Sequence, residues 1–165
     1  STLFPYTTLF RSKIYLDMSF YKELTTKYKA SGDFAMAYVI AHEVGHHVQN
    51  ELGILGKYHR MQQGLSEKER NAISVRIELQ ADYLAGVWAR SIQDRNLLDI
   101  GDIEEAMNAA HAVGDDTLQE QAYGYSVPDS FTHGTSEQRM RWFKRGYQYG
   151  DLQHGDTFSL SDSEL

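Results

Sequence analysis

The residues with the clearest chemistry lie in the segment His42-Glu43-Val44-Gly45-His46. On a helix, residues four positions apart project from one face, so both imidazoles can reach one Zn²⁺ at ~2.0–2.1 Å. Zinc lowers the pKa of a water to about 7, and Glu43 can take its proton and pass it to a leaving amine. The segment therefore predicts zinc-dependent hydrolysis of a peptide bond.

The same five-residue pattern also arises by chance on solvated helix faces. Here it follows an unbroken apolar run over residues 34–41, so the helix that carries it is expected to be buried. Burying unpaired imidazoles and a carboxylate costs several kcal/mol unless a group such as a metal ion compensates. The context therefore favours a zinc site.

A catalytic zinc needs a third protein ligand, and the candidate is Glu78. It lies in a largely apolar helical pattern with Asp82 four residues later on the same face. Glu78 would bind the metal, while Asp82 would accept the free ring N–H of a ligand histidine and fix its tautomer. The alternative for this segment is a surface helix with salt bridges around Arg76.

Composition excludes several other functions. The chain has 165 residues, 16 Lys and Arg against 23 Asp and Glu, and no cysteine. A net charge of −7 argues against nucleic acid as a partner. Without cysteine, a disulfide framework, a thiol nucleophile and a Cys-type zinc site are excluded, so any metal must bind histidines and carboxylates.

The elements that must position these residues are mostly helical. Residues 13–18 alternate as a strand with one buried face does, whereas the rest of the pattern predicts four or five helices. Capping boxes are expected at Ser66 with Glu69, Asp102 with Glu105 and Thr135 with Gln138. The expected helices cover residues 19–29, 33–52, 66–95, 102–114 and 135–150. The expected class is mostly α (α+β), a zincin-like domain with a short N-terminal β-strand region around a central HExxH helix.

Both ends of the chain stand out from this pattern. Residues 1–12, STLFPYTTLFRS, show no helical period, no capping signal and no signal-peptide layout, and we expect a non-native segment there. Residues 159–165 are polar and expected to be disordered. The expected domain is therefore residues 13–158, truncated at its N-terminus.

Four segments together resemble the bacterial neutral zinc metallopeptidases, a family of gluzincin type: AYVIAHEVGHHVQN, ELQAD, DIEEAMNAAHAVGDD and SFTHGTSEQRMRWF. The resemblance covers residues 13–158. It implies Zn²⁺ as cofactor, His42, His46 and Glu78 as its ligands, Glu43 as catalytic acid/base, and a peptide or protein as substrate. It also implies a membrane-anchoring helix in a missing N-terminal segment and a place in the bacterial cell envelope. Where the family pattern has two cysteines, this chain has Tyr83 and Gly155.

The resemblance also brings in His133 and Arg139. His133 is similar to the histidine that related gluzincins place near the oxyanion, and Arg139 would support it. His133 could instead cap local backbone as a loop residue, or replace Glu78 as third ligand. The rival function is a zinc-binding interaction or scaffold domain without turnover, although a purely structural zinc does not need Glu43 and closed sites usually have four protein ligands.

Overall fold

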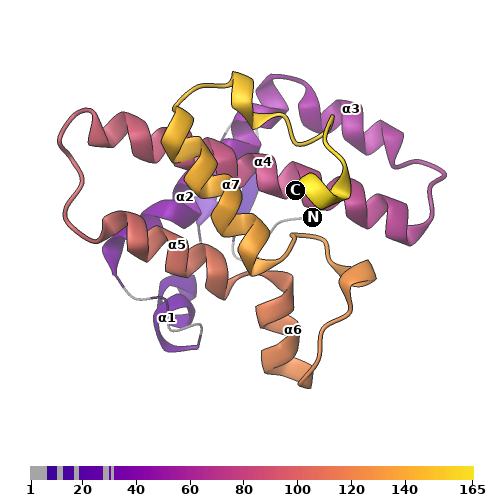
Figure 1. Cartoon of the computed structure of the whole chain (residues 1–165), viewed down its shortest axis with the longest axis horizontal. Coiled ribbons are helices and arrows are strands. Elements are labelled where there is room, and N and C mark those ends of the chain that lie inside the picture. Colours follow the sequence, from indigo (N-terminus) through magenta and orange to yellow (C-terminus); the bar gives the residue numbers. More distant parts are fainter. Residues whose placement is uncertain (1–6, 11–12, 17–18, 28–29, 31) are drawn as a thin grey trace.

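The computed structural model describes residues 7–10, 13–16, 19–27, 30 and 32–165. This part of the chain forms seven α-helices and three short 3₁₀ turns (Figure 1). The helices are α1 (Ser19–Thr26), α2 (Asp33–Glu51), α3 (Ile54–Met61), α4 (Glu67–Gln93), α5 (Asp102–Ala112), α6 (Asp115–Tyr123) and α7 (Ser136–Tyr149). The 3₁₀ turns are η1 (Pro128–Ser130), η2 (Gln153–Gly155) and η3 (Asp162–Glu164).

The expected α+β class is wrong in its β part, whereas mostly α is confirmed. In the described chain from residue 19 onward there is no strand, so no sheet lies among the helices. The strands β1 (Thr7–Phe10) and β2 (Lys13–Leu16) only pair with each other, antiparallel, with Thr7 opposite Leu16. Residues 17–18 of the expected strand lie outside the described residues. The two-residue alternation is confined to that short stretch, so the core is built by packing helix on helix.

Helices α2, α4, α5 and α7 pack together and form the core. Glycines set the closest approaches: a Cβ at Gly86 would overlap the carbonyl of Phe143, and one at Gly146 would overlap that of Tyr83. The α4 and α7 backbones are therefore in contact. A Cβ at Gly45 would lie 3.0 Å from the carbonyl oxygen of Ala81, so α2 crosses α4 closely within the HExxH segment itself.

Two of the three expected capping boxes are confirmed. The side-chain oxygens of Ser66 and Thr135 accept the backbone N–H of Glu69 and Gln138, respectively. The side chains of Glu69 and Gln138 accept the backbone N–H of Ser66 and Thr135 in return. These two capping boxes begin α4 and α7. The box expected at Asp102 is wrong, because α5 follows Gly101 without a side-chain cap. Its partner Glu105 instead accepts the backbone N–H of Phe34 at 3.1 Å, at the N-terminus of α2.

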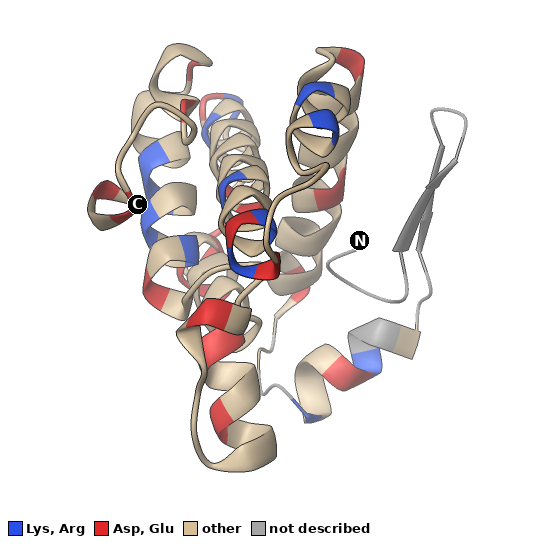
Figure 2. Cartoon of the chain, turned by 90° about the vertical axis from the view of Figure 1, so that its right-hand side faces the viewer, with Lys and Arg blue, Asp and Glu red and all other residues tan. Residues whose placement is uncertain are grey.

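Two helices were not expected. The sequence of α3 predicts a polar loop. In the structure Tyr58 of this helix stacks on Phe158, with ring centroids 3.6 Å apart, so a residue far away in the sequence packs against α3. Helix α6 begins at Asp115 directly after α5. Three of its nine residues are acidic and none is Lys or Arg (Figure 2).

The C-terminal tail differs from the disorder expected for residues 159–165. The side chain of Leu165 is buried, and its carbonyl oxygen accepts Nε1–H of Trp142 at 3.2 Å. Arg76 donates to the carbonyl of Leu160 and to the carboxylate of Asp162. A buried apolar side chain and hydrogen bonds from the partly buried Arg76 thus hold a segment that is polar on average.

Tyr83 and Gly155, which stand where the resembled family carries cysteines, are in contact. A Cβ at Gly155 would lie 2.6 Å from Cδ1 of Tyr83, so the ring occupies the space beside the glycine. The Tyr83 hydroxyl also bonds to Asp151 at 3.1 Å. An aromatic ring packed on a glycine thus joins α4 to the segment after α7.

None of the described helices combines the length and apolarity that crossing a bilayer requires.

Candidate metal centre

Three side chains from α2 and α4 converge on one point. Nε2 of His42 lies 3.2 Å from Oε2 of Glu78, and Nε2 of His46 lies 3.3 Å from the same oxygen. The two imidazole rings meet edge to face at an interplanar angle of 89°. In a tetrahedral zinc site with bonds of ~2.0–2.1 Å, neighbouring ligand atoms are about 3.3 Å apart. The observed spacing therefore fits a zinc ion with three protein ligands.

The surroundings of this point also fit a metal. Among the described residues that could hold one, His42, His46 and Glu78 form the most buried group. Next to them Glu43 is 4% exposed, and its Oε1 is buried without a hydrogen-bond partner in the described structure. Burial raises the pKa of Glu43. A buried carboxyl with an unused oxygen beside three ligand atoms is suited to a proton acceptor at the metal.

Asp82 supports His42 from behind, as the spacing predicts. Its Oδ1 lies 2.7 Å from Nδ1 of His42 and accepts the hydroxyl of Tyr38 at 2.6 Å. Its Oδ2 accepts Nε–H of Arg139 at 2.9 Å. This arrangement leaves Nε2 of His42 to face Glu78.

The charges of this network shift its pKa values. Burial alone would raise the pKa of Asp82, but Arg139 and His42 lower it to about 2. Burial alone would lower the pKa of His42, but Asp82 raises it to about 9. Burial would also raise the pKa of Glu78, yet His46 and His42 hold it well below its usual value. Glu78 and Asp82 are therefore held in the ionised form.

Arg139 is not where the resemblance placed it. It donates to Asp82, to the hydroxyl of Tyr38 at 3.0 Å and to the carbonyl of Val113 at 3.1 Å, so it supports His42 and not His133. The reason is that α7 packs directly on α4, which directs the first turn of α7 toward Asp82. Tyr38, one turn before His42, was missed because a tyrosine in an apolar run reads as core.

His133 is held by a residue that the sequence did not single out. Its Nδ1 lies 2.9 Å from Oδ1 of Asp115, whose Oδ2 accepts the backbone N–H groups of Thr132, His133 and Gly134. Nε2 of His133 is buried and has no hydrogen-bond partner within the described chain. A Cβ at Gly134 would lie 3.3 Å from Val75, so this loop packs on the turn of α4 that precedes Glu78. Asp115 could have been found as the acidic first residue of a helix after Gly114.

The geometry separates His133 from the ligand set. The carboxylate of Glu78, not the imidazole of His133, meets both Nε2 atoms of His42 and His46. His133 is thus an imidazole held by Asp115, outside the candidate ligand set and with one unused nitrogen.

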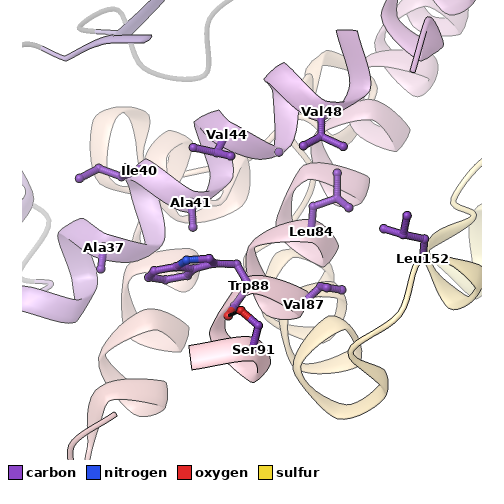
Figure 3. A pocket seen from close by; sticks show the side chains of 11 residues that line it. Ala37, Ile40, Ala41, Val44, Val48, Leu84, Val87, Trp88, Ser91 and Leu152 are labelled. Atoms are coloured by element: carbon purple, nitrogen blue, oxygen red, sulfur yellow. Dashed lines mark hydrogen bonds between the residues drawn. The ribbon is translucent and has the colours of Figure 1, made fainter. Parts of the chain in front are cut away.

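An apolar groove lies on the other side of α2. It has a volume of about 430 Å³ and is lined by Ile40, Val44 and Val48 of α2 and by Leu84 and Trp88 of α4 (Figure 3). None of the candidate ligands lines it. This apolar groove and the polar centre therefore lie on different faces of α2.

Comparisons with known proteins agree with this centre. The chain matches the family described as "Putative neutral zinc metallopeptidase" over residues 1–158. It is 57% identical over 148 residues to the uncharacterized protein YpfJ of Escherichia coli (strain K12), covering 90% of this chain and 52% of that protein. It is 44% identical over 159 residues to the uncharacterized protein Rv2575 of Mycobacterium tuberculosis (strain H37Rv), covering 90% of this chain and 53% of that protein.

The chain thus spans about half the length of the curated relatives it matches. No solved structure gives a significant match. The family match includes residues 1–12, whose expected non-native origin stays a prediction.

Proposed function

The chain belongs to the neutral zinc metallopeptidase family, and from that premise we propose that it hydrolyses peptide bonds in peptide or protein substrates, with Glu43 as general acid/base. The observation that carries the proposal is the convergence of His42, His46 and Glu78 beside the buried carboxyl of Glu43. We further propose that these three residues hold Zn²⁺.

The residues of the chain divide the work. When bound, zinc supplies the Lewis acidity that lowers the pKa of a water to about 7 and polarises a carbonyl. Glu43 accepts the proton of the attacking water at its unpartnered oxygen and donates it to the leaving amine. Asp82 holds the Nδ1 side of His42, which keeps Nε2 directed at the metal.

His133 would act at the substrate. Asp115 accepts from Nδ1 of the ring, which leaves Nε2 as the free nitrogen. With a proton on both ring nitrogens, Nε2 would donate to the charge that develops on the carbonyl oxygen. Because Asp115 also binds the backbone on both sides of His133, the imidazole is held before substrate arrives. Anchoring to a membrane through a segment outside this chain stays a prediction.

The test is Glu43→Gln, which keeps the shape of the side chain but cannot carry the proton. We expect the variant to keep its zinc and to lose cleavage of a peptide library by about 10²-fold or more. Glu51→Gln, an exposed change on the same helix, is the control and should cleave as wild type does. Equal cleavage by Glu43→Gln and wild type would show that the assigned base is wrong. Zinc binding with no cleavage by either protein would favour the rival, a zinc-binding module.

A further inference from the structure

Gln49 is buried between the two helices that carry the candidate ligands. It lies one turn after His46 on α2, and its side chain is completely buried. Its Nε2 donates to the carbonyl of Ile77 at 2.7 Å and to Oε1 of Gln80 at 3.1 Å. Its Oε1 lies 2.8 Å from Nδ1 of His46. One acceptor and two donors are all that a side-chain amide offers, so every polar group of Gln49 is used.

The orientation of this amide is determined by its partners. The carbonyl of Ile77 can only accept a hydrogen bond, so the NH₂ group of Gln49 must face it and Oε1 must face His46. Since Oε1 can only accept, Nδ1 of His46 must carry a hydrogen. The lone pair of a neutral His46 ring is then on Nε2, the nitrogen that lies 3.3 Å from Glu78.

We infer that Gln49 is the positioning residue of His46, which fixes the tautomer and the direction of its ring for the metal. The same amide is anchored to the peptide of Ile77, which directly precedes Glu78. One side chain thus sets a ligand on α2 relative to a ligand on α4. The inference rests on the proposed function, because it takes His46 and Glu78 as ligands of zinc.

The experiment measures zinc affinity by competition with a chelator. Gln49→Leu keeps the approximate volume and removes the acceptor for His46, so we expect zinc binding at least tenfold weaker, within the 10–100-fold range typical for such partners of a ligand histidine. Gln80→Leu is the matched control: it removes an amide from the same contact but none that touches His46. Its zinc affinity should stay within about twofold of wild type, since no partner of a ligand is lost.

Gln49→Glu distinguishes a role of Gln49 in positioning His46 from a role that only joins α2 to α4 by hydrogen bonds. The carboxylate still accepts from Nδ1 of His46 but cannot donate to Ile77, so we expect lower stability with zinc affinity reduced less than tenfold. Where Gln49→Leu does not fold, as judged by circular dichroism, Gln49→Glu decides alone by the same tenfold criterion.

The outcomes separate the inference from its premise. A zinc-binding wild type with a folded Gln49→Leu variant that loses less than tenfold in affinity overturns the inference alone. The inference is also overturned when Gln80→Leu and Gln49→Leu lose zinc affinity equally. A loss of zinc affinity of tenfold or more in Gln49→Glu overturns it as well. A wild-type chain that binds no zinc overturns both the proposed function and the inference.

Discussion

The two long faces of α2 invert the usual pattern of a helix in a globular protein. The inner face, formed by Tyr38, His42, His46 and Gln49, is polar and largely shielded from solvent, with His42 and Gln49 at 0% exposure and His46 partly exposed. The outer face, formed by Ile40, Val44 and Val48, is apolar and lines the groove, with Ile40 and Val44 each 41% exposed. A surface helix normally buries its apolar side.

This difference indicates that hydrogen bonds and charge position the side chains of the site, while apolar packing holds the helices that carry them. Each of the four residues of the inner face has a partner on α4 or α7, and His46 and Gln49 also bond to each other, because an unpaired polar group there would cost free energy. The side chains of the outer face have no polar groups that need partners, so substitutions there should leave the candidate metal centre intact. Four predictions test this contrast.

The largest effect should come from Arg139→Met. The substitution removes the guanidinium that pairs with the buried carboxylate of Asp82, and breaking a buried pair typically costs about 3–5 kcal/mol of unfolding free energy. Arg141→Met, two residues later, removes an exposed pair with Glu137 and should cost about 1 kcal/mol or less. Urea denaturation of both variants measures this difference, and equal losses would contradict the account of the inner face.

His133→Ala should slow catalysis without releasing zinc. Losing one donor to the transition state typically lowers kcat by ~10²–10³, and the ground-state ligands are untouched. His154→Ala, an exposed change, should leave kcat as it is. Loss of zinc from His133→Ala, in a parallel determination of metal content, would make His133 a ligand and remove the distinction between the ligand set and the loop beside it.

How much of this was readable in the sequence depends on the distance between partners along the chain. His42, Glu43 and His46 lie within one turn and a half of a helix, and Glu78 and Asp82 share a face at a spacing of four, so their positions follow from local periodicity. The alternation over residues 13–18 predicted the short strand β2 for the same reason, but the α+β class inferred from it was wrong.

The partners supplied by distant elements were not readable. Arg139 was singled out but matched to His133, because only the packing of α7 on α4 reveals Asp82 as its partner. Asp115 and Gln49 act through contacts with a loop and with a neighbouring helix. Helix α3 reads as a loop since its stacking partner, Phe158, lies a hundred residues away.

Zinc affinity should rise with pH. The pKa of His42 is about 9 without metal, so around neutral pH the ring is protonated on both nitrogens and must lose a proton from Nε2 to bind zinc. The affinity should therefore rise by up to about tenfold per pH unit from pH ~6 to ~8. In Asp82→Asn the pKa of His42 loses its main raising cause, so the rise should level off at lower pH. An affinity independent of pH, in proton-corrected chelator competition, would contradict the role given to Asp82.

The smallest effect should come from the outer face. Val44→Ser exchanges a half-exposed methyl pair for a hydroxyl and should cost about 1 kcal/mol of unfolding free energy or less, with no change in zinc affinity. Val39→Ser, at a fully buried position of the same helix, should cost more, about 2 kcal/mol. A marked fall in zinc affinity in Val44→Ser would show that the two faces of α2 are not independent.

The central claim is that His42, His46 and Glu78 hold one zinc ion, and the most direct measurement is metal content by mass spectrometry of wild type and Glu78→Gln. The account predicts about one zinc per wild-type chain and a sharp loss in Glu78→Gln, because three protein ligands are the minimum for a catalytic zinc site. Adding a chelator should also lower the melting temperature of the wild type but not that of the variant. A wild type without zinc, or a Glu78→Gln variant that keeps the full ion, would contradict the claim.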